Sequence, residues 1–214
     1  MVKLVIFDHD MTIVDSSYAI QACFNYVARH EGLPEVSHEL TMQYIATPLP
    51  TFCEGLLGDY RPEWLKIYRS VSDKYERELI KPFHDTVSTL TQLHDMGIKS
   101  AVVSNRERPS LPLERTGLAK YFDAIVGAEE PYGHLPYKPN PAMIDALLEH
   151  MNFTRDEAVY VGDADIDIVT AKAAHVRSIG ICKGNFSHQD FALLGAWKSI
   201  DNLSELIAIT QQDA

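Results

Sequence analysis

VIFDHDMT, residues 5–12, joins a run of apolar residues to two closely spaced carboxylates. The run ends at Asp8, and Asp10 follows two positions later. Side chains two apart in a strand share a face, so a strand that continued past Phe7 would aim both carboxylates at one point. Converging carboxylates are tolerated where a cation neutralises them, or where one holds a proton and the other does not. The stretch therefore predicts an acidic site at the end of a buried strand.

The composition disfavours several classes of partner. The chain has 214 residues, of which 46% are apolar, and this is enough to bury a large core. Nineteen Lys and Arg against thirty Asp and Glu give a formal net charge of -11, which repels nucleic acids and anionic membranes. An anionic small substrate would therefore need a locally positive pocket or a metal ion.

The cysteines and histidines indicate neither a disulfide framework nor a zinc site. Cys23, Cys53 and Cys182 are widely spaced and form no CxxC pattern, as in a protein of a reducing compartment. The nine histidines form no HxxxH or HExxH pattern. The first apolar run reaches Asp8 too early for a signal peptide, and no stretch approaches the roughly 18 apolar residues of a membrane span. We expect a soluble cytoplasmic protein.

Short apolar runs rich in Val and Ile recur along the rest of the chain, at residues 98–104, 123–127, 158–163 and 178–182. They lack clean polar alternation, which is typical of strands buried on both faces of a parallel sheet. Helical patterns lie between them, one capped by Asp85 and another opened by Asn140 and Pro141. This alternation predicts an α/β fold with a Rossmann-like, doubly wound parallel sheet.

Residues 16–83 follow a different pattern. Ser16 or Ser17 can cap an amphipathic helix that Gly32 ends, and a second long amphipathic stretch covers residues 64–79. No strand-like run separates the two stretches. We expect residues 16–83 to form a helical domain inserted into an α/β core made of residues 1–15 and 84–214.

Polar residues suited to phosphate chemistry follow the predicted strands. In open α/β sheets, ligands bind outside the carboxyl ends of the strands. The apolar runs end in Asp8, Ser104 and Asp163, Asp167 lies one helical turn further, and Lys138 precedes a predicted helix. Carboxylates hold Mg²⁺, while a hydroxyl and an ammonium group bind phosphoryl oxygens. Together these residue types indicate phosphoryl transfer.

The same residues form four motifs that occur in a fixed order. They are DHDMT at residues 8–12, VVSN at residues 102–105, KPNP at residues 138–141 and GDADID at residues 162–167. In this order and spacing the chain resembles hydrolases of the haloacid dehalogenase superfamily, in the phosphoglycolate-phosphatase-like branch with a helical cap. The first motif departs from the family's DxDGT at Met11, which stands in place of the usual glycine.

The resemblance implies a role for each acid. Asp8 would attack the substrate phosphorus and form an aspartyl-phosphate, and Asp10 would protonate the leaving oxygen and then deprotonate the attacking water. In the substrate complex Asp8 must therefore stay charged while Asp10 can hold a proton, a separation that Mg²⁺ on Asp8 and a drier position for Asp10 could produce. Mg²⁺ would be held by Asp8, by the backbone carbonyl of Asp10 and by Asp163. His9, between the two acids, would point away from them by strand alternation.

The resemblance also implies binding and positioning roles. Ser104, Asn105 and Lys138 would bind phosphoryl oxygens, and Asp167 would orient Lys138 or a metal-bound water. Thr12 would fix the backbone of the loop that carries the first acid. The helical cap would close over the site and set substrate selectivity.

These motifs leave several functions open. A sugar phosphomutase shares all of them, and pyrophosphate is as compatible a substrate as phosphoglycolate or a sugar phosphate. A response-regulator receiver domain uses similar residue types, but it is shorter and its phospho-acceptor follows a middle strand. An inactive member could also serve as a phospho-accepting or binding protein. We expect a Mg²⁺-dependent phosphatase for a small phosphorylated metabolite, a monomer or homodimer, without nucleic-acid or membrane partners.

Overall fold

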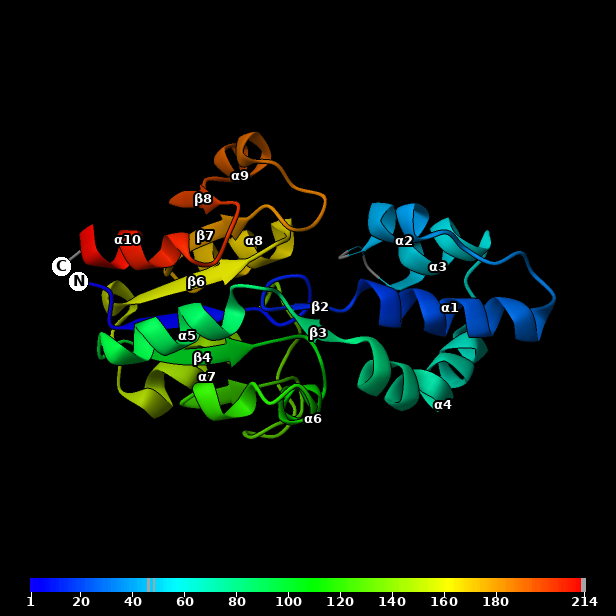
Figure 1. Ribbon diagram of the computed structural model, residues 1–214, viewed down its shortest axis with the longest axis horizontal. Coiled ribbons are helices and arrows are strands. Elements are labelled where there is room, and N and C mark those ends of the chain that lie inside the picture. Colours follow the sequence, from blue (N-terminus) through cyan, green and yellow to red (C-terminus); the bar gives the residue numbers. More distant parts are fainter. Residues whose placement is uncertain (46, 48, 213–214) are drawn as a thin grey trace. The chain divides into compact units, whose positions relative to one another are not determined.

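The computed structural model describes residues 1–45, 47 and 49–212 and divides into two compact units (Figure 1). The larger unit comprises Met1–Val14 and Pro82–Ala214, and the smaller unit comprises Asp15–Lys81. The chain therefore crosses from one unit to the other twice. Strands β2 (Val14–Asp15) and β3 (Lys81–Pro82) pair with each other at these crossings.

A six-stranded parallel sheet forms the centre of the larger unit, in the order β5-β4-β1-β6-β7-β8. Its strands are β1 (Leu4–Phe7), β4 (Lys99–Val103), β5 (Ala124–Val126), β6 (Ala158–Gly162), β7 (Arg177–Ile181) and β8 (Lys198–Ile200). This confirms the predicted Rossmann-like α/β fold. Strand β8 was not predicted, because its sequence, KSI, holds a single apolar residue.

Strand β1 lies in the middle of the sheet and is buried on both faces. All four of its residues are 0% exposed, since β4 and β6 flank the strand and helices cover the sheet. Leu4 and Ile6 belong to the core cluster that also contains Ile144 of α7. Burying an aliphatic side chain of this size contributes roughly 1.5–3 kcal/mol. This packing fixes the position at which Asp8 leaves the strand.

The larger unit also contains helices on the connections between strands. They are α5 (Thr86–Asp95), α6 (Ser110–Arg115), α7 (Ala142–Met151), α8 (Asp165–Ala173), α9 (His188–Leu194) and α10 (Glu205–Gln212), with 3₁₀ turns at Ala119–Tyr121 and Arg155–Glu157. Asn140 caps the first turn of α7 as predicted, because its Oδ1 accepts the backbone N–H of Ala142 at 3.0 Å. Among the described residues, no helix combines the length and apolarity that crossing a membrane requires.

The smaller unit contains helices α1 (Ser17–Glu31), α2 (His38–Tyr44), α3 (Leu49–Leu57) and α4 (Pro62–Leu79). Phe24 of α1 meets Tyr68 of α4 edge to face, with ring centroids 5.2 Å apart. Ser16 occupies the N-cap position of α1, as one of the two predicted serines, but its side chain makes no capping hydrogen bond. Asp15 Oδ1 accepts the backbone N–H of Ser17 at 3.0 Å instead. Gly32 follows α1 in the left-handed conformation, with φ of 68°, as its place in the sequence predicted.

Met11 adopts a backbone conformation that favours glycine. Its φ is 55°, inside the left-handed region, which costs a residue with a Cβ roughly 1–2 kcal/mol. Its side chain is nevertheless buried, since the residue is 4% exposed. The burial of the thioether therefore offsets the strain that glycine would have avoided.

We expect Met11→Gly to be more stable than Met11→Ala. Both variants lose the buried side chain, but only the alanine variant keeps a Cβ on left-handed backbone. The free energy of unfolding should differ by about 1 kcal/mol in favour of glycine, measured by urea denaturation of both proteins. An alanine variant that is equally stable or more stable would show that residue 11 carries no such strain.

Candidate active site

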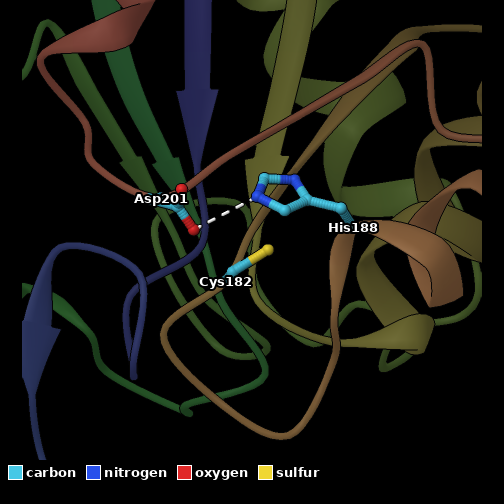
Figure 2. Close-up of side chains that lie close together, drawn as sticks. All are labelled: Cys182, His188 and Asp201. Atoms are coloured by element: carbon cyan, nitrogen blue, oxygen red, sulfur yellow. Dashed lines mark hydrogen bonds and ion pairs between the residues drawn. The ribbon is translucent and has the colours of Figure 1, made fainter.

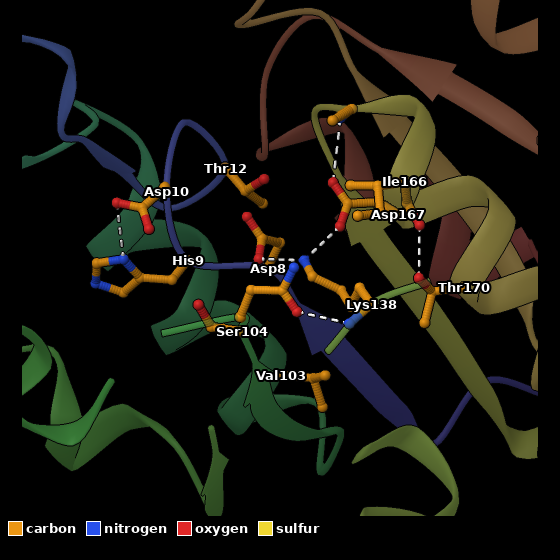
Figure 3. Close-up of polar contacts among 12 residues, drawn as sticks. Asp8, His9, Asp10, Thr12, Val103, Ser104, Lys138, Ile166, Asp167 and Thr170 are labelled. Carbon is orange, nitrogen blue, oxygen red and sulfur yellow. Dashed lines mark hydrogen bonds and ion pairs between the residues drawn. The ribbon is translucent and has the colours of Figure 1, made fainter. Parts of the chain in front are cut away.

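The carboxyl edge of the sheet brings the predicted site residues together (Figure 3). Strands β4, β1 and β6 are parallel neighbours, so Ser104, Asp8 and Asp163, which follow them, leave the sheet at one edge. Asp167 lies in the first turn of α8, and Lys138 reaches in from the loop before α7. All five residues are buried.

Lys138 connects two carboxylates at the centre of the site. Its Nζ lies 2.7 Å from Asp8 Oδ1 and 2.6 Å from Asp167 Oδ1. Burial would lower the pKa of this ammonium group, but Asp167 and Asp8 outweigh burial and hold its pKa well above the usual value. Lys138 Nζ also donates to the Tyr160 hydroxyl at 3.3 Å, and that hydroxyl donates to the Val103 carbonyl at 3.1 Å.

The centre of the site holds more buried negative than positive charge. Carboxylate oxygens of Asp8, Asp163 and Asp167 lie within 4.8 Å of one another, next to the single ammonium of Lys138. Burial, with the neighbouring carboxylates, raises the pKa of Asp8 to about 7 against the opposing effect of Lys138. The same causes raise the pKa of Asp163 well above its usual value. A divalent cation would relieve this repulsion, and carboxylate oxygens suit Mg²⁺, so the residues present fit such an ion.

Two neighbours hold the carboxylate of Asp163. Thr12 Oγ1 donates a hydrogen bond to Asp163 Oδ1 at 3.1 Å, so this threonine contacts an acid of the site directly. Gly184 approaches the other oxygen so closely that a Cβ at this position would lie 2.8 Å from Asp163 Oδ2. Asp163 is therefore confined on both sides.

Asp10 binds Arg106 instead of joining the carboxylate cluster. Nε and Nη2 of Arg106 lie 2.7 Å from Asp10 Oδ2 and 2.9 Å from Asp10 Oδ1. His9 Nδ1 lies 3.3 Å from Asp10 Oδ1, so the prediction that His9 points away from the acids is wrong. Burial would raise the pKa of Asp10, but Arg106 and then His9 hold it well below its usual value. Arg106 thus favours the ionised form of Asp10, whereas burial favours the protonated form of Asp8. The predicted order, in which Asp8 is charged and Asp10 holds a proton, concerns the substrate complex with Mg²⁺ on Asp8 and stays a prediction.

The side chains of Ser104 and Asn105 bind the backbone of the two cationic residues of the site, Arg106 and Lys138. Ser104 Oγ accepts the backbone N–H of Arg106 at 3.2 Å. Asn105 Oδ1 accepts the backbone N–H of Lys138 at 2.7 Å. The bond from Lys138 to Asn105 ties the loop after β4 to the loop before α7, although the two residues lie 33 positions apart in the sequence.

Arg106 and Tyr160 are site residues that the sequence did not predict. Arg106 has the pattern of an ordinary loop charge, and its partner Asp10 is 96 positions away. Tyr160 lies within a buried apolar strand, where a phenol needs a hydrogen-bond partner. That requirement is the one signal in the sequence that could have identified it.

Comparison with known proteins gives consistent results. The sequence profile of the haloacid dehalogenase-like hydrolases matches residues 5–181. A provisionally named pyrophosphatase PpaX from Caldanaerobacter subterraneus subsp. tengcongensis is 36% identical over 84% of this chain and 81% of that protein. A phosphoglycolate phosphatase from Aquifex aeolicus is 30% identical over 89% of this chain and 92% of that protein. The crystal structure of a provisionally named haloacid dehalogenase-like hydrolase from Bacteroides fragilis matches with a TM-score of 0.82 and 27% identity, over 96% of this chain and 100% of that chain.

A parallel α/β sheet with buried carboxylates and a lysine at its carboxyl edge defines a Rossmann-like enzyme. The chain belongs to the haloacid dehalogenase-like hydrolase family, as the four motifs predicted. It is similar throughout most of its length to relatives named as phosphatases and pyrophosphatases.

Gly162 has no room for a side chain, and replacing it should disturb the buried charges. A Cβ at this position would overlap with the carboxyl group of Asp167. We expect Gly162→Ala to push Asp167 away from Lys138 and from the backbone N–H of Ala164, which it now accepts at 3.1 Å. Breaking a buried ion pair costs about 3–5 kcal/mol, so the free energy of unfolding in urea should fall by that amount.

Gly58→Ala is the matched control for this steric effect. Gly58 has φ of 79°, and no neighbouring atom lies within 4 Å of the place that a methyl group would take, so alanine there meets backbone strain alone. We expect that control to lose only about 1 kcal/mol. Equal losses in the two variants would refute the clash with Asp167.

Proposed function

We propose that the chain is a Mg²⁺-dependent phosphatase that hydrolyses a small phosphorylated metabolite through an aspartyl-phosphate on Asp8. The observation that carries the proposal is the contact of 2.7 Å between Asp8 and Lys138, with Asp167 holding the lysine from the other side. A carboxylate beside a buried ammonium can attack phosphorus while the ammonium binds a phosphoryl oxygen.

The ligands that we assign to Mg²⁺ are Asp8, Asp163 and the backbone carbonyl of Asp10. When bound, the ion neutralises negative charge on the carboxylates and on the phosphoryl group. The raised pKa values of Asp8 and Asp163 support this assignment, because both result from burial next to other carboxylates.

In the first step, an Asp8 oxygen attacks the phosphorus, the bond from phosphorus to the leaving oxygen breaks, and Asp10 protonates that oxygen. Arg106 keeps Asp10 ionised in the structure, so Asp10 can hold this proton only after its ion pair with Arg106 is broken. Productive substrate binding therefore has to separate the two side chains.

In the second step, water attacks the aspartyl-phosphate, Asp10 accepts the proton of the water, and the bond from phosphorus to Asp8 breaks. The products are inorganic phosphate and the original Asp8 carboxylate. The ionised state that Arg106 favours in Asp10 suits this step, because a general base must begin without the proton.

The remaining residues of the site bind the phosphoryl group or hold other side chains of the site in position. We assign Ser104, Asn105 and Lys138 to the phosphoryl oxygens, since a hydroxyl, an amide and an ammonium group all donate hydrogen bonds. Asp167 positions Lys138 through the contact of 2.6 Å, and Thr12 positions Asp163. Positioning residues of this kind keep the reacting groups in a narrow range of geometry.

We assign the helical insert the role of a cap that selects the substrate and excludes water, on an α/β core that carries the chemistry. The support is the division of the chain, in which one continuous segment, Asp15–Lys81, forms a compact helical unit between two parts of the core.

We also propose a cytoplasmic protein, monomeric or homodimeric. All three cysteines lie in the described part of the chain and none forms a disulfide, which fits a reducing compartment.

Two substrate classes have support among the relatives. Phosphoglycolate and other small phosphate monoesters correspond to the relatives named phosphoglycolate phosphatase. Pyrophosphate is the second candidate, because the 36% identical relative is provisionally named a pyrophosphatase. Both substrates place a phosphoryl group against the same acids and the same lysine.

Phosphate release should require both Mg²⁺ and Asp8. We expect the protein to release phosphate from a panel of phosphoglycolate, sugar phosphates and pyrophosphate, with activity lost in EDTA and restored by Mg²⁺. Asp8→Asn should lower kcat by more than about 1,000-fold, because an amide is a poor nucleophile. Asp95→Asn, at an acid whose side chain is 73% exposed, is the control and should keep full activity. Wild-type turnover by Asp8→Asn would remove Asp8 from the mechanism.

Asp10→Asn should distinguish leaving groups by their need for a proton. We expect kcat/KM for an alkyl phosphate to fall by about 100- to 10,000-fold, the usual contribution of a general acid. Formation of the aspartyl-phosphate from p-nitrophenyl phosphate should be much less affected, since its phenolate leaves without protonation. Single-turnover kinetics with both substrates measures this difference. An equal loss for both would show that Asp10 does not protonate the leaving group.

A further inference from the structure

Three side chains of different elements converge beside the sheet, outside the proposed catalytic group (Figure 2). Cys182 follows β7, His188 is the first residue of α9, and Asp201 follows β8. A sulfur, an imidazole nitrogen and a carboxylate oxygen of these residues lie within 4.8 Å of one another. Sulfur and nitrogen donors favour transition metals such as zinc, whereas the oxygen donors around Asp8 favour Mg²⁺.

The backbone around each of the three residues is held in place. The backbone N–H of Cys182 donates to the Ile200 carbonyl at 2.8 Å, which ties the ends of β7 and β8 together. The N–H of Asp201 donates to Glu205 Oε1 at 2.9 Å. A capping box, in which the Ser187 backbone N–H and hydroxyl donate to the Asp190 carboxylate at 2.8 and 2.6 Å, fixes the turn before His188. The group is therefore prearranged by contacts that do not use its donor atoms.

The ring of His188 has the orientation of a metal-binding imidazole. Its Nδ1 lies 2.7 Å from Ser199 Oγ, and its Nε2 faces Asp201 Oδ1 at 3.2 Å. Metal-binding histidines usually donate one ring N–H to a neighbouring oxygen and present the other nitrogen to the ion. A carboxylate only accepts hydrogen bonds, so without a metal Nε2–H donates to Asp201. A cation between Nε2 and Asp201 would take the place of that proton, and the ring proton would then lie on Nδ1 and be donated to Ser199 Oγ.

The charges around Cys182 also favour a cation. The carboxylates of Asp201, Glu205 and Asp190 all act electrostatically on the Cys182 thiol. A negative surrounding of this kind attracts a metal ion, which in turn stabilises the thiolate. Cys182 is partly exposed, and both His188 and Asp201 are exposed, so an ion can reach the group from solvent.

We propose that Cys182, His188 and Asp201 bind a transition-metal dication of the zinc type, with water as the fourth ligand. Binding releases the proton of the thiol and forms one bond to each side chain. Ser199 is a positioning residue that orients the imidazole. The three ligands lie 6 and 13 positions apart in the sequence, which is why a search for local zinc motifs does not find them.

Cobalt(II) provides a direct test, because a cobalt–thiolate bond absorbs in the near ultraviolet. The full-length protein is titrated with Co²⁺ in excess Mg²⁺, which occupies carboxylate sites. We expect one equivalent of Co²⁺ to produce the thiolate band at micromolar concentration, and one equivalent of Zn²⁺ to remove it. Cys182→Ser should abolish the band, and His188→Gln should weaken Co²⁺ binding by at least about 100-fold.

Ser199→Ala distinguishes a metal centre from a simple cluster of polar side chains. Loss of a hydrogen bond to a ligand usually weakens metal binding about 10- to 100-fold, so we expect a shift of that size with the thiolate band retained. His94→Gln is the control, since His94 lies on α5 with its side chain 84% exposed, and it should not change the titration.

The proposal is overturned if the wild-type protein shows no thiolate band, or shows one only at millimolar Co²⁺. It is also overturned if folded His188→Gln binds Co²⁺ as tightly as the wild type. Circular dichroism of each variant establishes that it is folded. None of these measurements depends on phosphate release, so their failure leaves the proposed phosphatase function untouched.

Discussion

Burial of charge is the constraint on which the site depends. A buried lysine is tolerated only where carboxylates surround it, and Asp8 and Asp167 do so at hydrogen-bonding distance from Lys138. Asp163 then adds a further buried carboxylate, which leaves the centre short of positive charge. The protein therefore keeps a group of acids that its own lysine cannot neutralise. This shortage of positive charge favours binding of a cation, which would neutralise the remaining carboxylates.

Uncharged neighbours maintain this arrangement by restricting where the charged groups can move. Gly162 leaves space for the Asp167 carboxylate, and Tyr160 connects Lys138 to the backbone of the adjacent strand. Thr12 joins the first loop to Asp163, 151 positions away. These contacts cross between β1, β4 and β6, so the parallel order of the sheet is what brings them within reach. The arrangement of the charged groups thus depends on strands β1, β4 and β6 ending side by side.

The sequence predicted the strands that consist of apolar runs, and it predicted Asp8 and Asp163 because each follows such a run. Strand β8 was missed, because only one of its three residues is apolar. Ser16 was expected among the caps of α1, but the capping hydrogen bond comes from Asp15, since Asp15 and the two serines all suit this role and only the backbone geometry selects among them. The ion pair of Asp10 with Arg106 joins distant positions through side-chain reach. No local pattern in the sequence encodes such a pair.

The pairing of β2 with β3 has a consequence for how this architecture can diversify. The helical segment leaves and re-enters the α/β unit through two strands that lie side by side, so its ends need little extra ordering to meet. Loop-closure entropy rises only slowly with length, and a longer, shorter or entirely different segment could therefore be grafted between the same two strands. Recombination at this junction would exchange one helical segment for another while the register of β1 stays unchanged. A lineage built on this plan can thus replace the inserted segment without rebuilding its acids.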